Sequence, residues 1–333
     1  MKKIFLYILA VLFIIIILPS ICTKRRQDVA KKEDEKQEQN VAQVEKYDYS
    51  KYKDIRLFHS KTGEVEVLPF DEYLYGVVSS EMPVSYEMEA LKAQAIVART
   101  YTLYQIINSK SKHENADICD DYACCQAWIF KEDRMAKWKE DEAKANWEKI
   151  VNAVDLSKGK IITYSGKPID AFFHSNSGGK TENVSNVWGG SDLPYLKSVE
   201  TAGEEGYTQY SSEVKLTKEE LINKIKNKYS DFDIDFNQED CIKILEYTES
   251  GRVRTIKIGN KNIAGTEART IFGLRSTHFE VSFDENNVCF SVIGYGHGVG
   301  MSQTGADSLA KQGKNAEEII HHFYSNVDIK KIY

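Results

Sequence analysis

The segment from residue 79 to 88, SSEMPVSYEM, places one carboxyl group where it could do chemistry. Glu81 lies at the expected end of a helix, two residues before Pro83, so its side chain can project into a cleft. Apolar surroundings, to which Met82 and Val78 are suited, raise the pKa of such a carboxyl from about 4.3 toward ~6. Glu81 is therefore a candidate general acid, and a solvated or capping acid is the alternative.

Two basic side chains are predicted to share one face of the helix that follows Ser85. Lys92 and Arg99 are seven residues apart, and this spacing returns to nearly the same side of an α-helix. Both are candidates for holding hydroxyl and acetamido groups of a substrate. Alternatively they fix the Glu81 segment through ion pairs, and Arg99 suits this structural role better.

Two glycine-containing segments carry further candidates. FHSNSGG, at 173–179, presents His174, Ser175, Asn176 and Ser177 in succession, and a plain turn is the alternative to a binding rim.

GYGHGVG, at 294–300, lacks the G-x-G-x-x-G spacing of a dinucleotide site, so no organic cofactor is expected. Its alternating glycines predict a strand close beneath a ligand, with Tyr295, His297 and Val299 on one side. His297 and Gln303 are then candidate substrate contacts, although a packed structural histidine is an equal alternative for His297.

A polar loop holds four potential metal ligands within thirteen residues: His113, Cys119, Cys124 and Cys125. Three thiolates and one imidazole suit tetrahedral zinc, and four protein ligands would leave no open position. One structural zinc ion is therefore predicted, with a disulfide as the alternative in an oxidising compartment. Cys241 and Cys289 lie in apolar runs and are expected to be buried thiols.

Three of these segments together, 79–102, 173–184 and 294–306, resemble the stage II sporulation protein D family. That family consists of membrane-anchored lytic transglycosylases that cut peptidoglycan during engulfment in spore formation. The resemblance runs from about Ile55 to Tyr333 in the family's motif order. It implies that Glu81 is the catalytic acid and that FHSNSGG lies at the glycan cleft. Tyr195 and Lys197, in PYLK, match a further family position, where Tyr195 could stack on a sugar ring or orient Glu81.

The resemblance also implies a reaction and partners. A single carboxyl would protonate the glycosidic oxygen between N-acetylmuramic acid and N-acetylglucosamine, then accept the C6 hydroxyl proton as a 1,6-anhydro ring closes. Ordinary glycosidases use two carboxyls instead. The expected substrate is glycan already stripped of stem peptides, and the expected partners are the amidase P and membrane protein M of the engulfment complex. A noncatalytic glycan-binding module, a glycan hydrolase using water and a metallo-amidase are the alternatives.

The N-terminal residues predict a membrane anchor. Residues 4–21 are uncharged and apolar over a length that can cross a hydrocarbon core of ~30 Å, so we expect an uncleaved transmembrane helix within 1–22. A cleaved signal peptide and a lipoprotein at Cys22 are alternatives. Basic residues flank both ends, so the orientation rests on the resemblance, which implies an ectodomain outside the cytoplasm, on the mother-cell membrane facing septal peptidoglycan. Residues 23–54 are highly polar and predict a linker.

The composition and charge of the chain limit its partners. A net charge of −6 and no basic cluster beyond the membrane flanks argue against nucleic acid as a partner. The predicted ectodomain has an α+β fold, with a catalytic core over 55–210 plus 286–333 and an inserted second lobe over 211–285. Expected helices lie within 71–78, 85–102, 138–154, 217–225, 301–312 and 316–324, and expected strands lie at 55–59, 65–68, 160–164, 169–173, 242–248, 253–258, 278–283 and 288–293.

Overall fold

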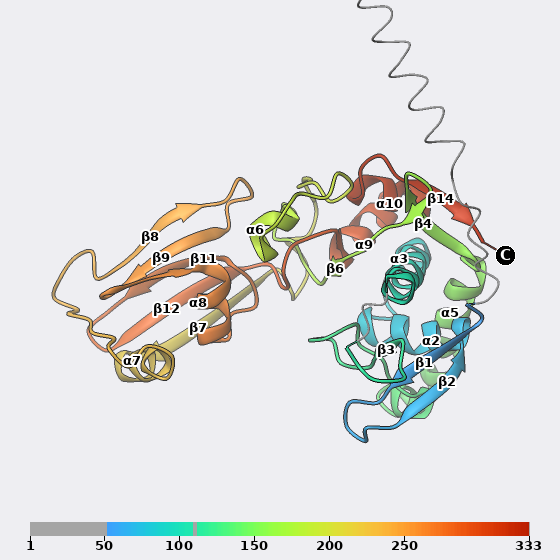
Figure 1. Cartoon of the computed structure of the whole chain (residues 1–333), viewed down its shortest axis with the longest axis horizontal. Coiled ribbons are helices and arrows are strands. Elements are labelled where there is room, and N and C mark those ends of the chain that lie inside the picture. The colour runs from blue at the N-terminus through green and yellow to red at the C-terminus, as the bar shows by residue number, and fades with distance from the viewer. Residues whose placement is uncertain (1–51, 109–111, 333) are drawn as a thin grey trace, which may run out of the picture. The chain divides into compact units, whose positions relative to one another are not determined.

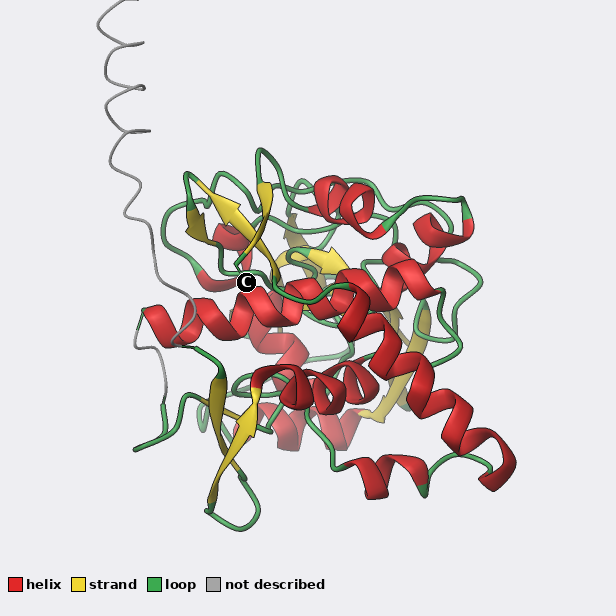
Figure 2. Ribbon diagram, turned by 90° about the vertical axis from the view of Figure 1, so that its right-hand side faces the viewer, coloured by secondary structure: helices red, strands yellow, loops and turns green. Residues whose placement is uncertain are grey.

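A computed structural model describes residues 52–108 and 112–332. The predicted anchor at 1–22 and nearly all of the predicted linker at 23–54 lie outside these residues. The described residues belong to one compact unit of mixed helices and small sheets, which confirms the predicted α+β class (Figure 2). Within the two described ranges, every helix is too short or too polar to cross a bilayer.

The first hydrophobic core is built around one long helix, α3, which spans Met88–Ile107. Four alanines, at 90, 93, 95 and 98, let neighbouring elements approach closely, and α3 is buried on almost every side. Figure 1 shows it between the helices near the N-terminal hairpin and those near the C-terminus. The helices that pack against α3 are α2 (Phe70–Glu81), α5 (Glu140–Leu156), α9 (Gln303–Lys311) and α10 (Ala316–Phe323). The short helix α4 (Lys131–Met135) packs against α2 and α5, and α6 spans Val184–Trp188.

Three small sheets border this core. The predicted N-terminal hairpin is confirmed as β1 (Asp54–Phe58) and β2 (Val65–Pro69), and β3 (Ile118–Cys119) pairs parallel to β1. A second sheet has the order β14-β4-β5, with β14 at Asp328–Lys331, β4 at Lys160–Tyr164 and β5 at Lys167–Pro168. The strand predicted at 169–173 does not form over that range. Of those residues only Phe173 lies in a strand, β6 (Phe173–His174), which pairs with β13 (Met301–Ser302).

Two predicted helix starts also differ from the structure. The helix predicted from residue 71 begins one residue earlier, after Pro69, and Asp71 lies in the first turn of α2. The helix predicted from residue 85 begins later, at Met88, with Glu87 at the N-cap position of α3. Acidic residues in the first turn of each helix favour the helix dipole without a capping hydrogen bond.

A second hydrophobic core lies between residues 211 and 293. Thr217 and Glu220 form the predicted capping box at the start of α7. The four strands predicted here are confirmed, and two three-stranded sheets result, ordered β10-β9-β8 and β11-β12-β7. Their elements are β7 (Ser211–Thr217), α7 (Lys218–Lys226), β8 (Ile242–Tyr247), β9 (Val253–Ile258), β10 (Lys261–Ala264), α8 (Gly265–Phe272), β11 (His278–Phe283) and β12 (Asn287–Ile293). Thus β12, which follows the predicted end of the inserted lobe, packs in this second core.

The segment 294–300 is a loop and not the predicted strand. Each of its four glycines has a positive φ, between 72° and 116°, which an extended strand does not allow. At Gly296 an added Cβ would lie 2.7 Å from the Cβ of His174. The backbones of Asn176 and Tyr295 exchange hydrogen bonds of 2.9 and 2.8 Å. The glycines therefore let this loop pack directly against FHSNSGG.

Candidate active site

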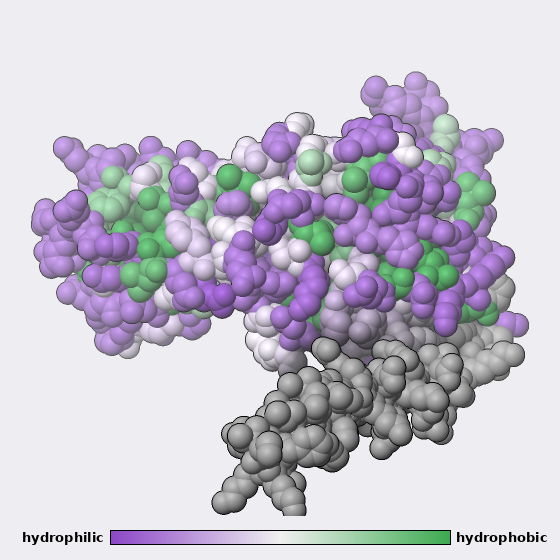
Figure 3. Space-filling model, turned by 90° about the horizontal axis from the view of Figure 1, so that it is seen from above, coloured by the Kyte–Doolittle hydropathy of each residue, from purple (hydrophilic) through white to green (hydrophobic). Residues whose placement is uncertain are grey.

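The two glycine-containing segments and the end of α2 line one cavity of about 1060 Å³. Seen from above, the coloured face of the molecule is mostly hydrophilic, with scattered apolar groups (Figure 3). Of the residues predicted from sequence, the cavity brings together Glu81, His174, Ser175, His297, Gln303, Cys124 and Cys125. Its other lining residues include Trp188, Arg269, Tyr295, Tyr122, Tyr101 and Asp170.

Glu81 is the last residue of α2, as its position before Pro83 predicts. Its Oε1 accepts a hydrogen bond from the backbone N–H of Ala127 at 2.7 Å, and its Oε2 accepts one from the side-chain amide of Gln303 at 3.2 Å. Burial raises the pKa of Glu81 and outweighs these two bonds, which lower it. Met82 and Val78 beside it are buried, as expected. The carboxyl can therefore hold a proton in the cavity.

His174 lines the cavity as a buried, neutral imidazole. It is 4% exposed, and its Nδ1 lies 3.1 Å from the carbonyl oxygen of Val299, which requires the proton on Nδ1. Burial and the nearby Arg252 lower the pKa of His174 to about 3, so the ring stays neutral. Its Nε2 has no hydrogen-bond partner in the described structure. His174 Nε2 is therefore a buried acceptor beside the cavity, without a partner among the described residues.

His297 is held in a fixed orientation beside His174. Its Nδ1 accepts a hydrogen bond from the backbone N–H of Val299 at 3.1 Å. Burial, followed by the charges of neighbouring groups, holds the pKa of His297 well below its ordinary value. Its ring contacts Trp188, with ring centroids 5.0 Å apart, and Trp188 is half exposed to the cavity. The two rings are tilted by 53° to each other and form a partly apolar part of the cavity wall.

FHSNSGG divides into residues that face the cavity and residues that build its wall. Ser175 lines the cavity, and its carbonyl oxygen accepts from the N–H of Thr304 at 3.0 Å. Asn176 and Ser177 are fully buried and do not line it. The Asn176 side chain accepts from the N–H of Gly178 at 2.9 Å, a local turn contact. These two side chains shape the loop that presents His174 and Ser175.

The other predicted binding residues lie away from the lining of this cavity. Arg99 is fully buried; its guanidinium pairs with Asp71 at 3.0 Å and bonds the carbonyl oxygen of Ser157 at 3.0 Å. Lys92 pairs with Glu89 at 2.8 Å along α3. Lys197 pairs with Asp192 at 3.2 Å, and Tyr195 is buried with its hydroxyl accepting from the N–H of Asp170 at 3.3 Å. Tyr195 thereby contacts a segment that does line the cavity.

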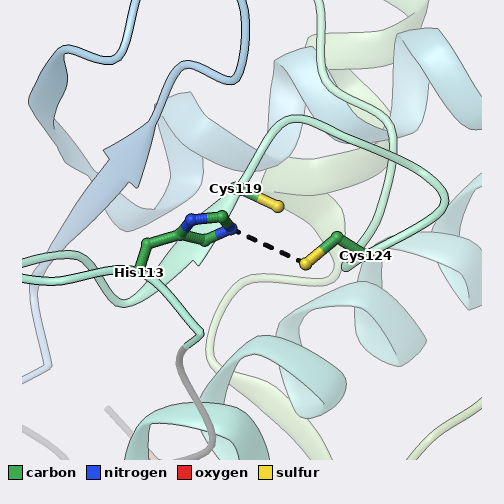
Figure 4. A group of neighbouring side chains, drawn as sticks. All are labelled: His113, Cys119 and Cys124. Atoms are coloured by element: carbon green, nitrogen blue, oxygen red, sulfur yellow. Dashed lines mark hydrogen bonds between the residues drawn. The ribbon is translucent and has the colours of Figure 1, made fainter.

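Three of the four predicted metal ligands converge on one point, and Cys125 lies beside them. The ligand atoms of His113, Cys119 and Cys124 lie within 4.8 Å of one another, and Figure 4 shows the three side chains facing a common space. The Cys124 sulfur lies 3.6 Å from His113 Nε2 and 3.8 Å from the Cys125 sulfur. Ligands of tetrahedral zinc stand roughly 3.5–3.8 Å apart, so this donor set fits the ion. The three cysteines are free thiols, without a disulfide between them.

Comparison with known proteins gives the family. A family model described as stage II sporulation protein matches residues 58–164, which contain Glu81 and the cysteine cluster. The stage II sporulation protein D of Bacillus amyloliquefaciens is 37% identical over 278 residues, covering 83% of this chain and 78% of that protein. This chain belongs to the stage II sporulation protein D family. The family predicted from the motifs is therefore confirmed.

Two further relatives extend this result. The stage II sporulation protein D of Bacillus subtilis (strain 168) is 34% identical, covering 83% of this chain and 79% of that protein. The amidase enhancer of the same organism is 27% identical, covering 75% of this chain but 39% of that protein. Most of this chain therefore matches the two stage II sporulation proteins D over most of their length, and it matches a smaller part of the longer amidase enhancer.

Glu204 is a site residue that sequence reasoning missed. It is fully buried, and six groups donate hydrogen bonds to its carboxylate: the N–H and hydroxyl of Ser177, the N–H of Gly179, and the hydroxyls of Thr201, Ser302 and Thr304. Burial alone would raise the pKa of Glu204, but these hydrogen bonds outweigh it and lower that pKa. The carboxylate ties FHSNSGG to the start of α9 and so places Gln303. Its sequence context, AGEEGY, gives no signal of this role.

Proposed function

We propose that this protein is a lytic transglycosylase that cleaves the bond between N-acetylmuramic acid and N-acetylglucosamine in peptidoglycan glycan strands, a carbon–oxygen lyase reaction. The observation that carries the proposal is the raised pKa of Glu81, a carboxyl held by two donors in a cavity large enough for several sugars. Membership in a sporulation family supports a role in cell-wall remodelling during engulfment.

In the first step, Glu81 transfers its proton to the glycosidic oxygen as the bond from that oxygen to C1 of the muramic acid breaks. The N-acetylglucosamine side leaves as an alcohol. In the second step, O6 of the same muramic acid attacks C1, and its proton passes to the Glu81 carboxylate. The 1,6-anhydro ring closes, no water is consumed, and the acid is regenerated. Ala127 and Gln303 are placed to stabilise the carboxylate between the steps.

The cavity walls supply binding groups that match a sugar chain. His174 adds a neutral imidazole ring to the wall, and Ser175 adds a small polar group. Trp188 and Tyr295 are partly exposed aromatic rings that suit stacking on pyranose faces. We infer that the buried residues Arg99, Asn176 and Ser177 act on binding through these groups, by holding the walls in place.

We propose a structural role for zinc at His113, Cys119 and Cys124, with Cys125 beside them. When bound, the ion supplies a cross-link between β3 and the loop after it. That loop continues directly to Ala127, whose N–H contacts Glu81 at 2.7 Å. Ordering of the loop therefore bears on the position of the acid, without the ion taking part in bond cleavage.

We further propose that the ectodomain faces peptidoglycan from a single membrane anchor on the mother-cell side, and that its substrate is strands cleared of stem peptides by an amidase. One relative is named an amidase enhancer, which supports a functional link to amidases. The engulfment amidase P and membrane protein M are the partners that we propose on the basis of family resemblance.

A second candidate reaction is hydrolysis by water. Asp170 is a second carboxyl group lining the same cavity, and a glycosidase that uses two carboxyls could employ it as a base. The Nε2–H of Gln105 donates to Asp170 at 3.3 Å, and Asp170 is 6% exposed, which leaves little room for a water beside it. Transglycosylation by Glu81 alone needs no such water.

The test is cleavage of purified peptide-free glycan strands by wild type and Glu81→Gln, read by mass spectrometry. We expect fragments ending in 1,6-anhydro-muramic acid from wild type and a loss of at least about 100-fold in rate for Glu81→Gln, with strand binding retained. Asp170→Asn serves as the matched carboxyl control and is expected to keep anhydro products. Reducing ends from wild type would favour the hydrolase, and binding without cleavage would favour a noncatalytic module.

A further inference from the structure

Arg269 is a positive group in the cavity with no established role. It lies in the last turn of α8, within the second core, yet it lines the same cavity as Glu81. Its one hydrogen bond within the described residues runs from Nε–H to the carbonyl oxygen of Leu274 at 3.3 Å, which leaves the two terminal nitrogens available. No carboxylate of residues 52–108 or 112–332 forms an ion pair with it.

The two fully buried arginines of the described residues, Arg99 and Arg252, have acidic neighbours. Arg99 pairs with Asp71 at 3.0 Å, and the positive charge of Arg252 is favoured by the nearby Glu182 and Glu204. Burial lowers the pKa of Arg269, because the partly buried charge is not compensated. An uncompensated, partly desolvated guanidinium is costly unless an anion joins it. Retaining one in a substrate cavity points to an anionic ligand.

The groups around Arg269 do not supply that anion. His174 and His297 are neutral because burial lowers their pKa values far below neutral pH. Tyr295 lines the cavity, and its ring is covered by the guanidinium of Arg275, with 5.1 Å between that guanidinium and the ring centroid. Arg252 lies behind the cavity lining, where Glu182 and Glu204 favour its charge and its Nη2–H donates to the carbonyl oxygen of Ser177 at 2.7 Å. Arg269 therefore brings a positive charge to this side of the cavity lining.

We propose that Arg269 binds a carboxylate of the glycan substrate, namely the lactyl carboxylate of a muramic acid that carries no stem peptide. This inference rests on the proposed function. The two sugars of the glycan are otherwise uncharged, and attachment of a stem peptide converts the lactyl carboxylate into a neutral amide. A guanidinium fork matches a carboxylate through two parallel hydrogen bonds and would not gain them from the amide.

The carboxylates of a stem peptide are a second source of the same chemistry. Position favours the lactyl group, because it is joined to the sugar ring whose glycosidic oxygen must reach Glu81. Arg269 and Glu81 line one cavity, so a glycan strand bound there can contact both. A stem peptide carries its carboxylates several bonds further from the ring, outside the reach of the bond that is cleaved.

The test measures binding and cleavage by the full-length protein in detergent. Three strand preparations are compared: peptide-free with free lactyl carboxylates, peptide-free with those carboxylates converted to methylamides, and strands with stem peptides. The variants are Arg269→Gln and Arg269→Lys. Arg254→Gln, in β9, is the control, because Arg254 pairs with Glu246 at 3.0 Å and does not line the cavity. Binding is measured with each change placed on Glu81→Gln, so it does not depend on catalysis.

We expect the free carboxylate to improve binding and cleavage about tenfold over the methylamide, Arg269→Gln to abolish this difference, and Arg269→Lys to restore part of it. Arg254→Gln should behave as wild type, and unfolding temperatures should show that the Arg269 variants are folded. An equal loss on free and amidated strands, or no loss on either, would overturn the proposal. A loss confined to peptide-bearing strands would assign Arg269 to the stem peptide and also overturn it. Products without anhydro ends would contradict the proposed function separately, while the binding comparison would still decide the role of Arg269.

Discussion

The side-chain amide of Gln303 donates a hydrogen bond to Oε2 of Glu81 at 3.2 Å, across 222 positions of sequence. Glu81 ends α2 and Gln303 begins α9, so this contact joins the first and third motif segments at the proposed acid. The donor favours the charged carboxylate, while burial favours the protonated acid. The balance between the two sets the pH range over which Glu81 can donate a proton.

Replacing Gln303 with Ala should change the pKa of Glu81. Losing the donor destabilises the carboxylate, so the pKa of Glu81 should rise further and the alkaline fall of kcat/KM should shift to higher pH. We expect kcat at neutral pH to fall about tenfold or more, because the carboxylate formed in the first step is less stabilised. The measurement is the pH profile of strand cleavage. Gln312→Ala, at the other end of α9, should leave it unchanged, and an unshifted profile in Gln303→Ala would contradict the role of the contact.

The raised pKa of Glu81 also predicts how stability depends on pH. The folded state holds the Glu81 proton more tightly than the unfolded state, so this contribution to stability is full below the unfolded pKa and is lost as pH rises through the folded pKa. Glu81→Gln stays neutral and should lose nothing over that range. We expect the variant to unfold at a higher temperature than wild type at pH 8, and the two to converge near pH 4. A variant less stable than wild type at pH 8 would argue against a destabilised carboxylate.

Glu204→Gln should destabilise the folded protein, because Glu204 lies at the centre of a buried hydrogen-bond network. The six donors match a carboxylate, and a Gln side chain offers one oxygen and places an NH₂ group against the others. We expect a loss of ~2–5 kcal/mol in the free energy of unfolding at pH 7. Because the pKa of Glu204 is lowered on folding, the loss should shrink as pH falls below its unfolded value. Urea unfolding measures it, and the exposed neighbour Glu205 provides the control Glu205→Gln.

Removing zinc should loosen the loop that leads to Ala127. We expect a purified sample to contain about one zinc per chain, and chelation or Cys119→Ser to lower the unfolding temperature and cleavage together. Metal content by mass spectrometry and thermal unfolding are the measurements. Cys289→Ser, on β12 away from the cluster, should retain the metal. Full stability after complete removal of zinc would contradict a structural role.

Local patterns were enough to predict much of the fold. The N-terminal hairpin, the long helix α3 and the capping box at Thr217 follow from alternation, helical periodicity and side-chain caps, which act over a few residues. The strand predicted at 294–300 was wrong because the four glycines serve a different purpose. Their positive φ values let the loop approach His174, a residue 122 positions from Gly296.

The site was harder to predict because its parts meet only through tertiary contacts. Glu81, His174, His297 and Gln303 were found because their segments have recognisable composition, and the structure places all four around one cavity. Glu204 and Arg269 have no local signal. The first is identified by donors that converge on it from two distant segments, and the second by its entry from α8 into a cavity built mainly by other elements.

The most direct test of the account is cleavage of peptide-free glycan strands in water enriched in ¹⁸O, followed by mass spectrometry of the new muramic acid ends. Intramolecular attack by O6 incorporates no solvent oxygen, so we predict anhydro ends with unlabelled mass from the first turnover. Incorporation of one ¹⁸O into each new end would show that water is the nucleophile, and would contradict a mechanism in which Glu81 serves as both acid and base.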